Sequence, residues 1–123
     1  MELKTIKLVL LFGAISLMSS CYYDAENELY PSVTCDTETM SYKDDVSPII
    51  TQNCFACHRN NSTISTISLE GYNNLLVQVE NGALVGTITH ASGYSAMPQN
   101  LSKMSSCNIS KIQAWIVQGA LDN

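Results

Sequence analysis

Five consecutive residues, Cys54-Phe55-Ala56-Cys57-His58, combine two thiols and an imidazole at close spacing. In a C-x-x-C-H segment, each thiol can form a thioether with one vinyl group of a porphyrin, and the adjacent histidine can bind the iron. The segment therefore predicts one covalently attached c-type haem, held by Cys54 and Cys57 and ligated by His58. A haem of this kind would form the centre of a small protein's core.

The same segment has other interpretations. A C-x-x-C pair also occurs in zinc sites and in thioredoxin-like redox proteins. Cys35, His90 and Cys107 could supply further zinc ligands, but the chain lacks the second pair that zinc ribbons and fingers usually have. A thioredoxin-like pair would begin a helix in a βαβ pattern, and no such pattern surrounds Cys54. A zinc-binding or structural protein without haem remains the alternative.

The N-terminus has the pattern of an export signal. Two lysines precede an apolar stretch over residues 8–18, which is too short for a comfortable membrane span. Ser19-Ser20-Cys21 resembles a bacterial lipobox, although Met18 stands where leucine is usual. We expect a lipoprotein signal peptide over residues 1–20 and a diacylglycerol on Cys21. The alternative is an ordinary signal peptide and a free thiol.

These signals predict a location in the bacterial cell envelope, with the lipid anchoring the protein to a membrane and the domain facing the periplasm or the exterior. The chain has 11 acidic and 6 basic residues and a net charge of −5. Nucleic-acid binding requires a basic surface, so no nucleic-acid partner is expected. The negative charge favours a protein partner with a basic docking face, through electrostatic steering.

The chain contains five cysteines, an odd number. If Cys21 is lipidated and Cys54 and Cys57 hold haem, only Cys35 and Cys107 remain. Because export places the protein in an oxidising compartment, we expect these two to form a disulfide. The alternative is two free thiols. A bridge would tie the segment that precedes the domain to the last helix.

The hydrophobic pattern divides the exported chain into two parts. Residues 21–41 are acidic and lack periodicity, so we expect a tether, followed by one small domain over residues 42–123. Helical spacing predicts helices over residues 44–53 and 73–79, with Val77-Gln78-Val79 leaving a strand as the alternative for part of the second. Residues 83–88 fit either an extended segment or a short helix.

The end of the chain predicts a further helix. It can be capped by Ser105, Ser106 or Asn108, and its apolar residues recur at spacings of three and four. We expect Trp115 and Val117 to widen its apolar face. The positions that carry this spacing are Ile109, Ile112, Ile116 and Ala120. The wider set of core candidates is Ile49, Ile50, Leu69, Leu75, Leu84 and Ile112.

The order of these features resembles a small monohaem cytochrome c, and most closely the lipoprotein cytochrome c domains of bacterial envelopes. The resemblance spans residues 42–121. It rests on the C-x-x-C-H segment after a short helix, on Met97-Pro98 in a later loop, and on Ala114-Trp115-Ile116 in the last helix. It implies an all-α, class I-like cytochrome c fold, in which short helices and loops wrap around one covalent haem.

In this family the motif histidine is the proximal iron ligand and a loop methionine is the distal ligand. The corresponding residues here are His58 and Met97. A thioether ligand stabilises ferrous iron and raises the reduction potential. Met97 could instead fill the core, in which case Met104 or His90 would be the distal ligand, or the distal position would be open.

The resemblance implies a carrier of single electrons between a redox-protein donor and a redox-protein acceptor. The sequence shows no constellation of catalytic acid, base and nucleophile, so we expect no enzyme activity. An open distal position would instead indicate a haem enzyme or a sensor subunit. Arg59 and Tyr94 are candidates to contact a haem propionate, and Trp115 is expected to pack against the haem pocket.

Overall fold

The computed structural model describes residues 35–123 of the chain. The predicted signal peptide, Cys21 and the first part of the predicted tether lie outside these residues. Among the helices of the described part, none has the length and apolar character needed to cross a membrane.

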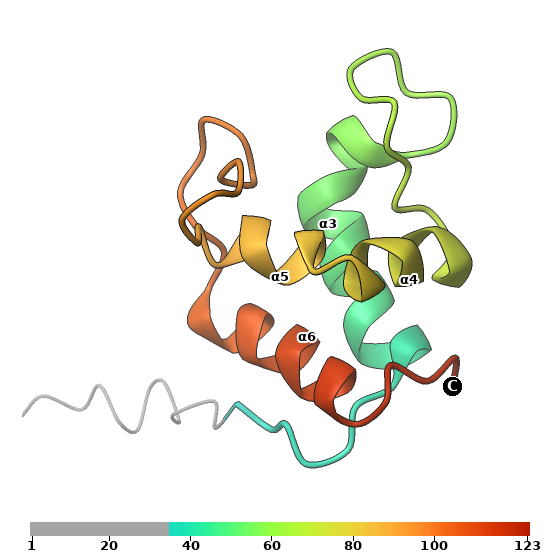
Figure 1. The fold of residues 1–123 in the computed structure, drawn as a ribbon. Coiled ribbons are helices and arrows are strands. Elements are labelled where there is room, and N and C mark those ends of the chain that lie inside the picture. Colours follow the sequence, from blue (N-terminus) through green and yellow to red (C-terminus); the bar gives the residue numbers. More distant parts are fainter. Residues whose placement is uncertain (1–34) are drawn as a thin grey trace, which may run out of the picture. The chain divides into compact units, whose positions relative to one another are not determined.

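Every regular element in residues 35–123 is helical (Figure 1), which confirms the predicted all-α class. Residues 77–79 belong to a helix rather than to a strand, and residues 83–88 are helical rather than extended. The elements are a π-helical turn η1 (Tyr42–Val46) and the helices α3 (Ser47–His58), α4 (Tyr72–Glu80), α5 (Ala83–Ile88) and α6 (Ser106–Val117).

A pair of reciprocal hydrogen bonds fixes the start of the first helical stretch. The Ser41 hydroxyl accepts from the backbone N–H of Asp44 at 3.2 Å, and the Asp45 carboxylate accepts from the backbone N–H of Ser41 at 3.0 Å. These bonds satisfy backbone donors that a helix start leaves free, as in a capping box. The helix predicted for residues 44–53 therefore starts earlier, as η1, and α3 continues to His58. The C-x-x-C-H segment forms the end of α3.

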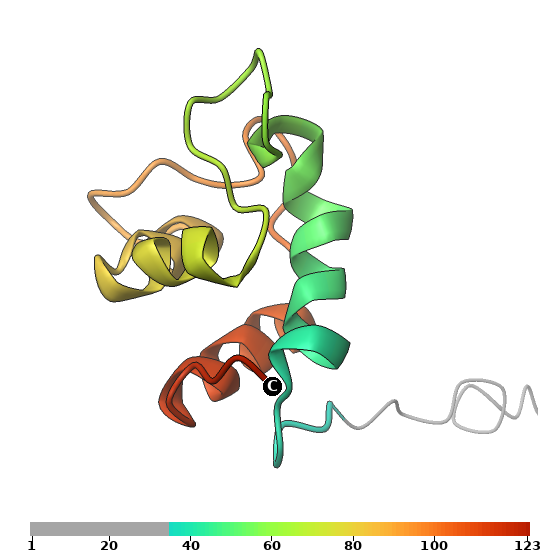
Figure 2. The same ribbon diagram turned by 90° about the vertical axis from the view of Figure 1, so that its right-hand side faces the viewer.

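Helix α3 meets two different environments along its length. In its first half, Ile49 and Ile50 are buried in the apolar core. In its second half, Cys54 and Cys57 line a cavity. Figures 1 and 2 both show α6 beside the first turns of α3, whereas the loop after His58 lies at the other end. One helix thus connects the packed core to the cavity.

The turn between α4 and α5 depends on a glycine. Gly82 has φ 74°, in the left-handed region that a side chain disfavours. The Asn81 side chain adds to the turn, because its amide oxygen accepts from the backbone N–H of Ala83 at 2.8 Å. This sharp turn lets the two helices bury Leu75 and Leu84 in the same core.

Helix α6 begins at the first of its predicted caps. The Ser105 hydroxyl accepts from the backbone N–H of Asn108 at 3.2 Å. The expectation for Val117 was wrong, since its side chain is 87% exposed. Val117 lies two positions after the buried tryptophan, and residues at that spacing point to different sides of a helix. The buried face consists of Ile109, Ile112 and Trp115.

Trp115 packs within an aromatic cluster rather than at the cavity. Its ring lies 5.8 Å from the ring of Tyr42 and 6.4 Å from that of Tyr72, measured between centroids. Its indole N–H donates to the backbone oxygen of Leu121 at 2.9 Å. The side chain is 1% exposed and is not among the residues that line the cavity. The expectation that Trp115 packs at the haem pocket was therefore wrong.

Residues 35–41 are packed against the last helix, although we expected them to belong to the tether. Met40 is 5% exposed and belongs to the core, and its backbone N–H donates to the Gln118 side chain at 2.8 Å. Cys35 is joined to Cys107 by a disulfide, with their Cα atoms 5.4 Å apart. The packed unit therefore begins before the expected boundary at residue 42. All six of the wider core candidates are buried.

Candidate functional site

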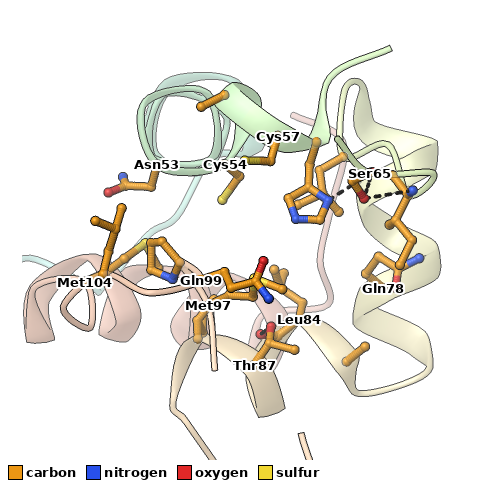
Figure 3. Close-up of a pocket in the computed structure, with 18 of the residues that line it drawn as sticks. Asn53, Cys54, Cys57, Ser65, Gln78, Leu84, Thr87, Met97, Gln99 and Met104 are labelled. Atoms are coloured by element: carbon orange, nitrogen blue, oxygen red, sulfur yellow. Dashed lines mark hydrogen bonds between the residues drawn. The ribbon is translucent and has the colours of Figure 1, made fainter. Parts of the chain in front are cut away.

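The two thiols of the C-x-x-C-H segment lie on one side of α3. Residues three positions apart are neighbours on a helix surface, and both Cys54 and Cys57 line the cavity as free cysteines. Figure 3 shows both on the side of α3 that faces the cavity. Burial, with a smaller contribution from Cys57, raises the pKa of Cys54 to about 11. The Cys54 sulfur is therefore neutral at neutral pH, and its surroundings suit an uncharged thiol or thioether.

His58 ends α3 with its ring in a defined orientation. Its Nδ1 lies 3.0 Å from the backbone oxygen of Ile67 in the following loop. Because a carbonyl oxygen only accepts, Nδ1 must carry the hydrogen, and the lone pair is then on Nε2. Metal-binding histidines usually have this arrangement, in which a carbonyl fixes the tautomer and the ring orientation. His58 is thus prepared to bind a metal through Nε2.

The cavity beside these residues has a volume of about 350 Å³. This is within the range of pockets that hold small molecules and cofactors. Among the described residues that line it, none is Asp, Glu, Lys or Arg, and these side chains are apolar or carry uncharged polar groups. The apolar lining side chains outside the C-x-x-C-H segment are Ile64, Ile67, Leu69, Ala83, Leu84, Ile88, Met97, Pro98, Leu101 and Met104.

Met97 lies across the cavity from the two cysteines. Figure 3 shows it close to Leu84 and Thr87, on the side opposite Cys54 and Cys57. Its backbone N–H donates to the oxygen of Thr87 at 3.1 Å, which ties the loop to the end of α5. Its sulfur-bearing side chain is half-buried. The structure therefore brings Cys54, Cys57, His58 and Met97 together around one space.

Met104 also lines the cavity. Its side chain is 8% exposed and belongs to the apolar core. Figure 3 shows Met104 at a different edge of the cavity from Met97, near Asn53. Met40 belongs to the core without lining the cavity. Met97 thus differs from both of these residues, since it lines the cavity but is not part of the core.

Three further candidates lie outside the cavity lining. Arg59 is exposed, and Tyr94 is 45% exposed. His90 directs its Nε2 toward the backbone oxygen of Met97, 3.0 Å away. The structure thus connects His90 to the site through the peptide of Met97, rather than through direct contact with the cavity.

The residues that we considered as further zinc ligands are not placed to act together. The disulfide joins Cys35 to Cys107, which leaves neither with a thiolate. Within residues 35–123, no group of three or more His, Cys, Asp and Glu side chains is arranged to hold a metal ion. A zinc site built on Cys54, Cys57 and His58 would need a ligand from outside this part of the chain.

Sequence reasoning missed the polar residues of the cavity wall and the groups that hold the two candidate iron ligands. The carbonyl oxygens of Ile67 and Thr87 orient His58 and Met97. Every residue has such an oxygen, so residue types give no signal of its role. The uncharged polar side chains of the wall are Asn53, Ser65, Gln78, Thr87 and Gln99.

Comparisons of the chain with protein-family models, with curated proteins and with solved structures find no match. The interpretation of the site therefore depends on its residues and their geometry.

Proposed function

We propose that this chain is a monohaem c-type cytochrome with a class I-like fold, which carries single electrons between redox proteins in the bacterial cell envelope. One observation carries the proposal: two thiols three residues apart, an imidazole with its Nε2 lone pair free and a thioether line a single cavity. Cys54 and Cys57 would hold the haem by thioethers, and His58 and Met97 would be the iron ligands.

The properties of the cavity fit this group. Its apolar walls would exclude water from a porphyrin, and the raised pKa of Cys54 favours an uncharged sulfur over a thiolate. Bound there, the haem would supply reversible one-electron exchange at its iron. The protein's part is to position two axial ligands and to keep the site dry, which tunes the potential.

The residues that line the cavity favour an electron carrier over an enzyme. Its lining residues within the described range 35–123 include no carboxylate, lysine or arginine to act on a substrate, and His58 is the histidine among them. A haem enzyme or sensor would need an open distal position, whereas Met97 lines the cavity opposite the cysteines. We propose no catalytic residue and no enzyme activity.

The location and partners are proposed from the sequence. A lipid on Cys21 would anchor the protein to an envelope membrane. The net charge of −5 favours a redox partner with a basic docking face and disfavours nucleic acid. Metabolic labelling with palmitate tests the anchor: we expect label in the wild type and none in Cys21→Ala, and label retained in the variant would contradict it.

The haem itself is tested by expressing the full chain together with a cytochrome c maturation system. We expect a pyridine haemochrome spectrum of c type and a chromophore that stays with the denatured chain. Cys54→Ser/Cys57→Ser should lose this covalent chromophore. Cys35→Ser/Cys107→Ser removes the same number of thiols and should keep it. A colourless wild-type protein with bound zinc would overturn the proposal.

A further inference from the structure

The segment between α5 and α6 carries Met97, and hydrogen bonds join its first residues to its last ones. We call residues 89–98 the Met97 loop. We infer that His90 is a positioning residue, which keeps this loop closed and thereby holds Met97 at the cavity. The inference rests on the proposed function, because its consequence for iron depends on Met97 being a ligand.

The first observation is the contact between His90 and Met97. The Nε2 atom of His90 lies 3.0 Å from the backbone oxygen of Met97. Because this oxygen only accepts, the ring nitrogen must donate. The N–H of Met97 donates to the oxygen of Thr87 at 3.1 Å, and the same oxygen accepts from the N–H of His90 at 3.2 Å. The backbone N–H of Met97 is therefore bound to α5, and its backbone oxygen is bound to His90 at the beginning of the loop.

The second observation is the backbone of His90 itself. Its φ is 55°, in the left-handed region, which a residue with a side chain rarely adopts. The surrounding contacts hold it there. The next residue, Ala91, donates its N–H to the oxygen of Gly86 at 2.9 Å, so the chain turns back onto α5 directly after His90. A costly conformation persists only where neighbouring interactions determine it.

The third observation is the packing of Tyr94, in the middle of the loop, against two glycines. Gly82 and Gly86 are four residues apart and so lie on one side of the chain around α5. A Cβ atom at Gly86 would lie 2.5 Å from the Tyr94 ring, and one at Gly82 would lie 3.4 Å from its hydroxyl. The ring therefore rests where these two residues have no side chain. This contact holds the loop on α5 independently of His90.

These contacts predict how strongly the loop opposes the replacement of Met97 at the iron by an added ligand. An external imidazole can bind ferric iron only when Met97 leaves it. The apparent affinity for imidazole is therefore the intrinsic affinity multiplied by the fraction of molecules with the loop open. His90 lies outside the cavity lining, so its substitution changes this fraction without changing the cavity wall.

The test measures imidazole binding to the haem-loaded ferric protein by its absorption spectrum. We expect His90→Ala to bind imidazole about two- to tenfold more tightly than the wild type, the range that corresponds to the loss of one hydrogen bond. His90→Gln keeps an N–H donor on a side chain of similar reach and should stay close to the wild type. Ser92→Ala, an exposed position in the same loop, is the matched control.

A second pair of variants tests the closed loop without touching His90. Gly86→Ala places a methyl group against the Tyr94 ring and should also tighten imidazole binding. Gly86→Ala/Tyr94→Ala removes the clash, and its affinity should return toward that of Tyr94→Ala alone. This pair keeps the inference open to test if His90→Ala does not fold.

Unchanged imidazole affinity in folded His90→Ala would overturn the inference. Equal tightening in His90→Ala and His90→Gln would also overturn it, since the hydrogen bond would then play no part. Met97→Ala distinguishes failure of the inference about His90 from failure of the proposed ligand role of Met97. If Met97→Ala leaves the ferric spectrum unchanged, Met97 is not a ligand, and the inference about His90 falls together with the proposed role of Met97. If Met97→Ala alters the spectrum and His90→Ala alters nothing, only the role of His90 is lost.

Discussion

The imidazole of His58 and the backbone oxygen of Ile67 are joined by a hydrogen bond of 3.0 Å that spans the first turns of the loop after α3. The Ser65 hydroxyl holds the same residue, because it donates to this oxygen at 3.3 Å and accepts from the N–H of Ile67 at 3.1 Å. Ser65 therefore supports the orientation of a proposed iron ligand without contacting it.

We expect Ser65→Ala to loosen the peptide of Ile67 and to weaken the bond from His58. An imidazole with a weaker Nδ1 partner is less basic, which disfavours ferric iron and raises the reduction potential. Voltammetry and the exchange rate of the His58 Nδ1–H by NMR measure the two effects. Thr66→Ala, at an exposed neighbouring position, is the control. Identical potentials and exchange rates in Ser65→Ala and the wild type would contradict the prediction.

The identity of the distal ligand is tested at the two methionines that line the cavity. Met97→Ala should lose the near-infrared band that arises from sulfur-to-iron charge transfer, and its potential should fall because the thioether no longer stabilises ferrous iron. Met104→Leu keeps the volume of a core side chain and should retain the band. Retention of the band in Met97→Ala, with loss in Met104→Leu, would instead assign the ligand to Met104.

The disulfide should contribute substantially to stability. It joins residues 72 positions apart, and a loop of this length restricts the unfolded chain by on the order of 4 kcal/mol. We expect Cys35→Ser/Cys107→Ser to lower the free energy of unfolding by an amount of this order, measured by guanidinium denaturation of the haem-loaded protein. Added reductant should destabilise the wild type and leave the variant unchanged. Equal stability of the two proteins would rule the contribution out.

Asp45 predicts a pH dependence of stability. The hydrogen bond from the backbone of Ser41 lowers the pKa of Asp45; burial partly opposes this, and Lys111, 3.1 Å away, lowers it further. The folded-state pKa thus lies below the unfolded value. The contribution of the carboxylate to stability is present above about pH 4, where it is ionised in both states, and is lost as pH falls through the folded pKa.

We therefore expect Asp45→Asn to be less stable than the wild type by up to about 1 kcal/mol at pH 7, because the amide lacks the negative charge that faces Lys111. The difference should shrink below about pH 4. Denaturation curves at several pH values measure it. Asp44→Asn makes the same change in charge at an exposed position in the same turn and should have little effect. A difference that persists undiminished at the lowest pH would mean that ionisation of Asp45 plays no part.

The sequence predicted the elements whose residues repeat with helical spacing. Ile109 and Ile112 identified the last helix and its buried side, and Leu75 and Leu84 were correctly placed in the core. Residues 83–88 stayed ambiguous because six residues give less than two helical turns. The prediction for Trp115 was wrong because a position on the buried face of a helix does not show which neighbours pack against it. The rings of two tyrosines that are distant in sequence pack against Trp115.

The sequence predicted which side chains form the candidate site, but not the contacts that orient them. Cys54, Cys57, His58 and Met97 have types and spacing that indicate chemistry, and the structure brings all four to one cavity. The contacts that orient them use backbone oxygens, which no residue type reveals. His90 was considered as an iron ligand, but its ring faces the backbone of Met97.

The bridge between Cys35 and Cys107 also determines where a mechanical load would enter the domain. A force that pulls on the chain before residue 35 meets a covalent bond to the first turns of α6. The load bypasses Met40 and the hydrogen bonds that Gln118 makes to residues 37, 38 and 40. Tension applied to the chain before residue 35 would therefore act on α6 and leave the packed segment at residues 36–41 in place. Reduction of the bridge would instead allow that segment to peel away first.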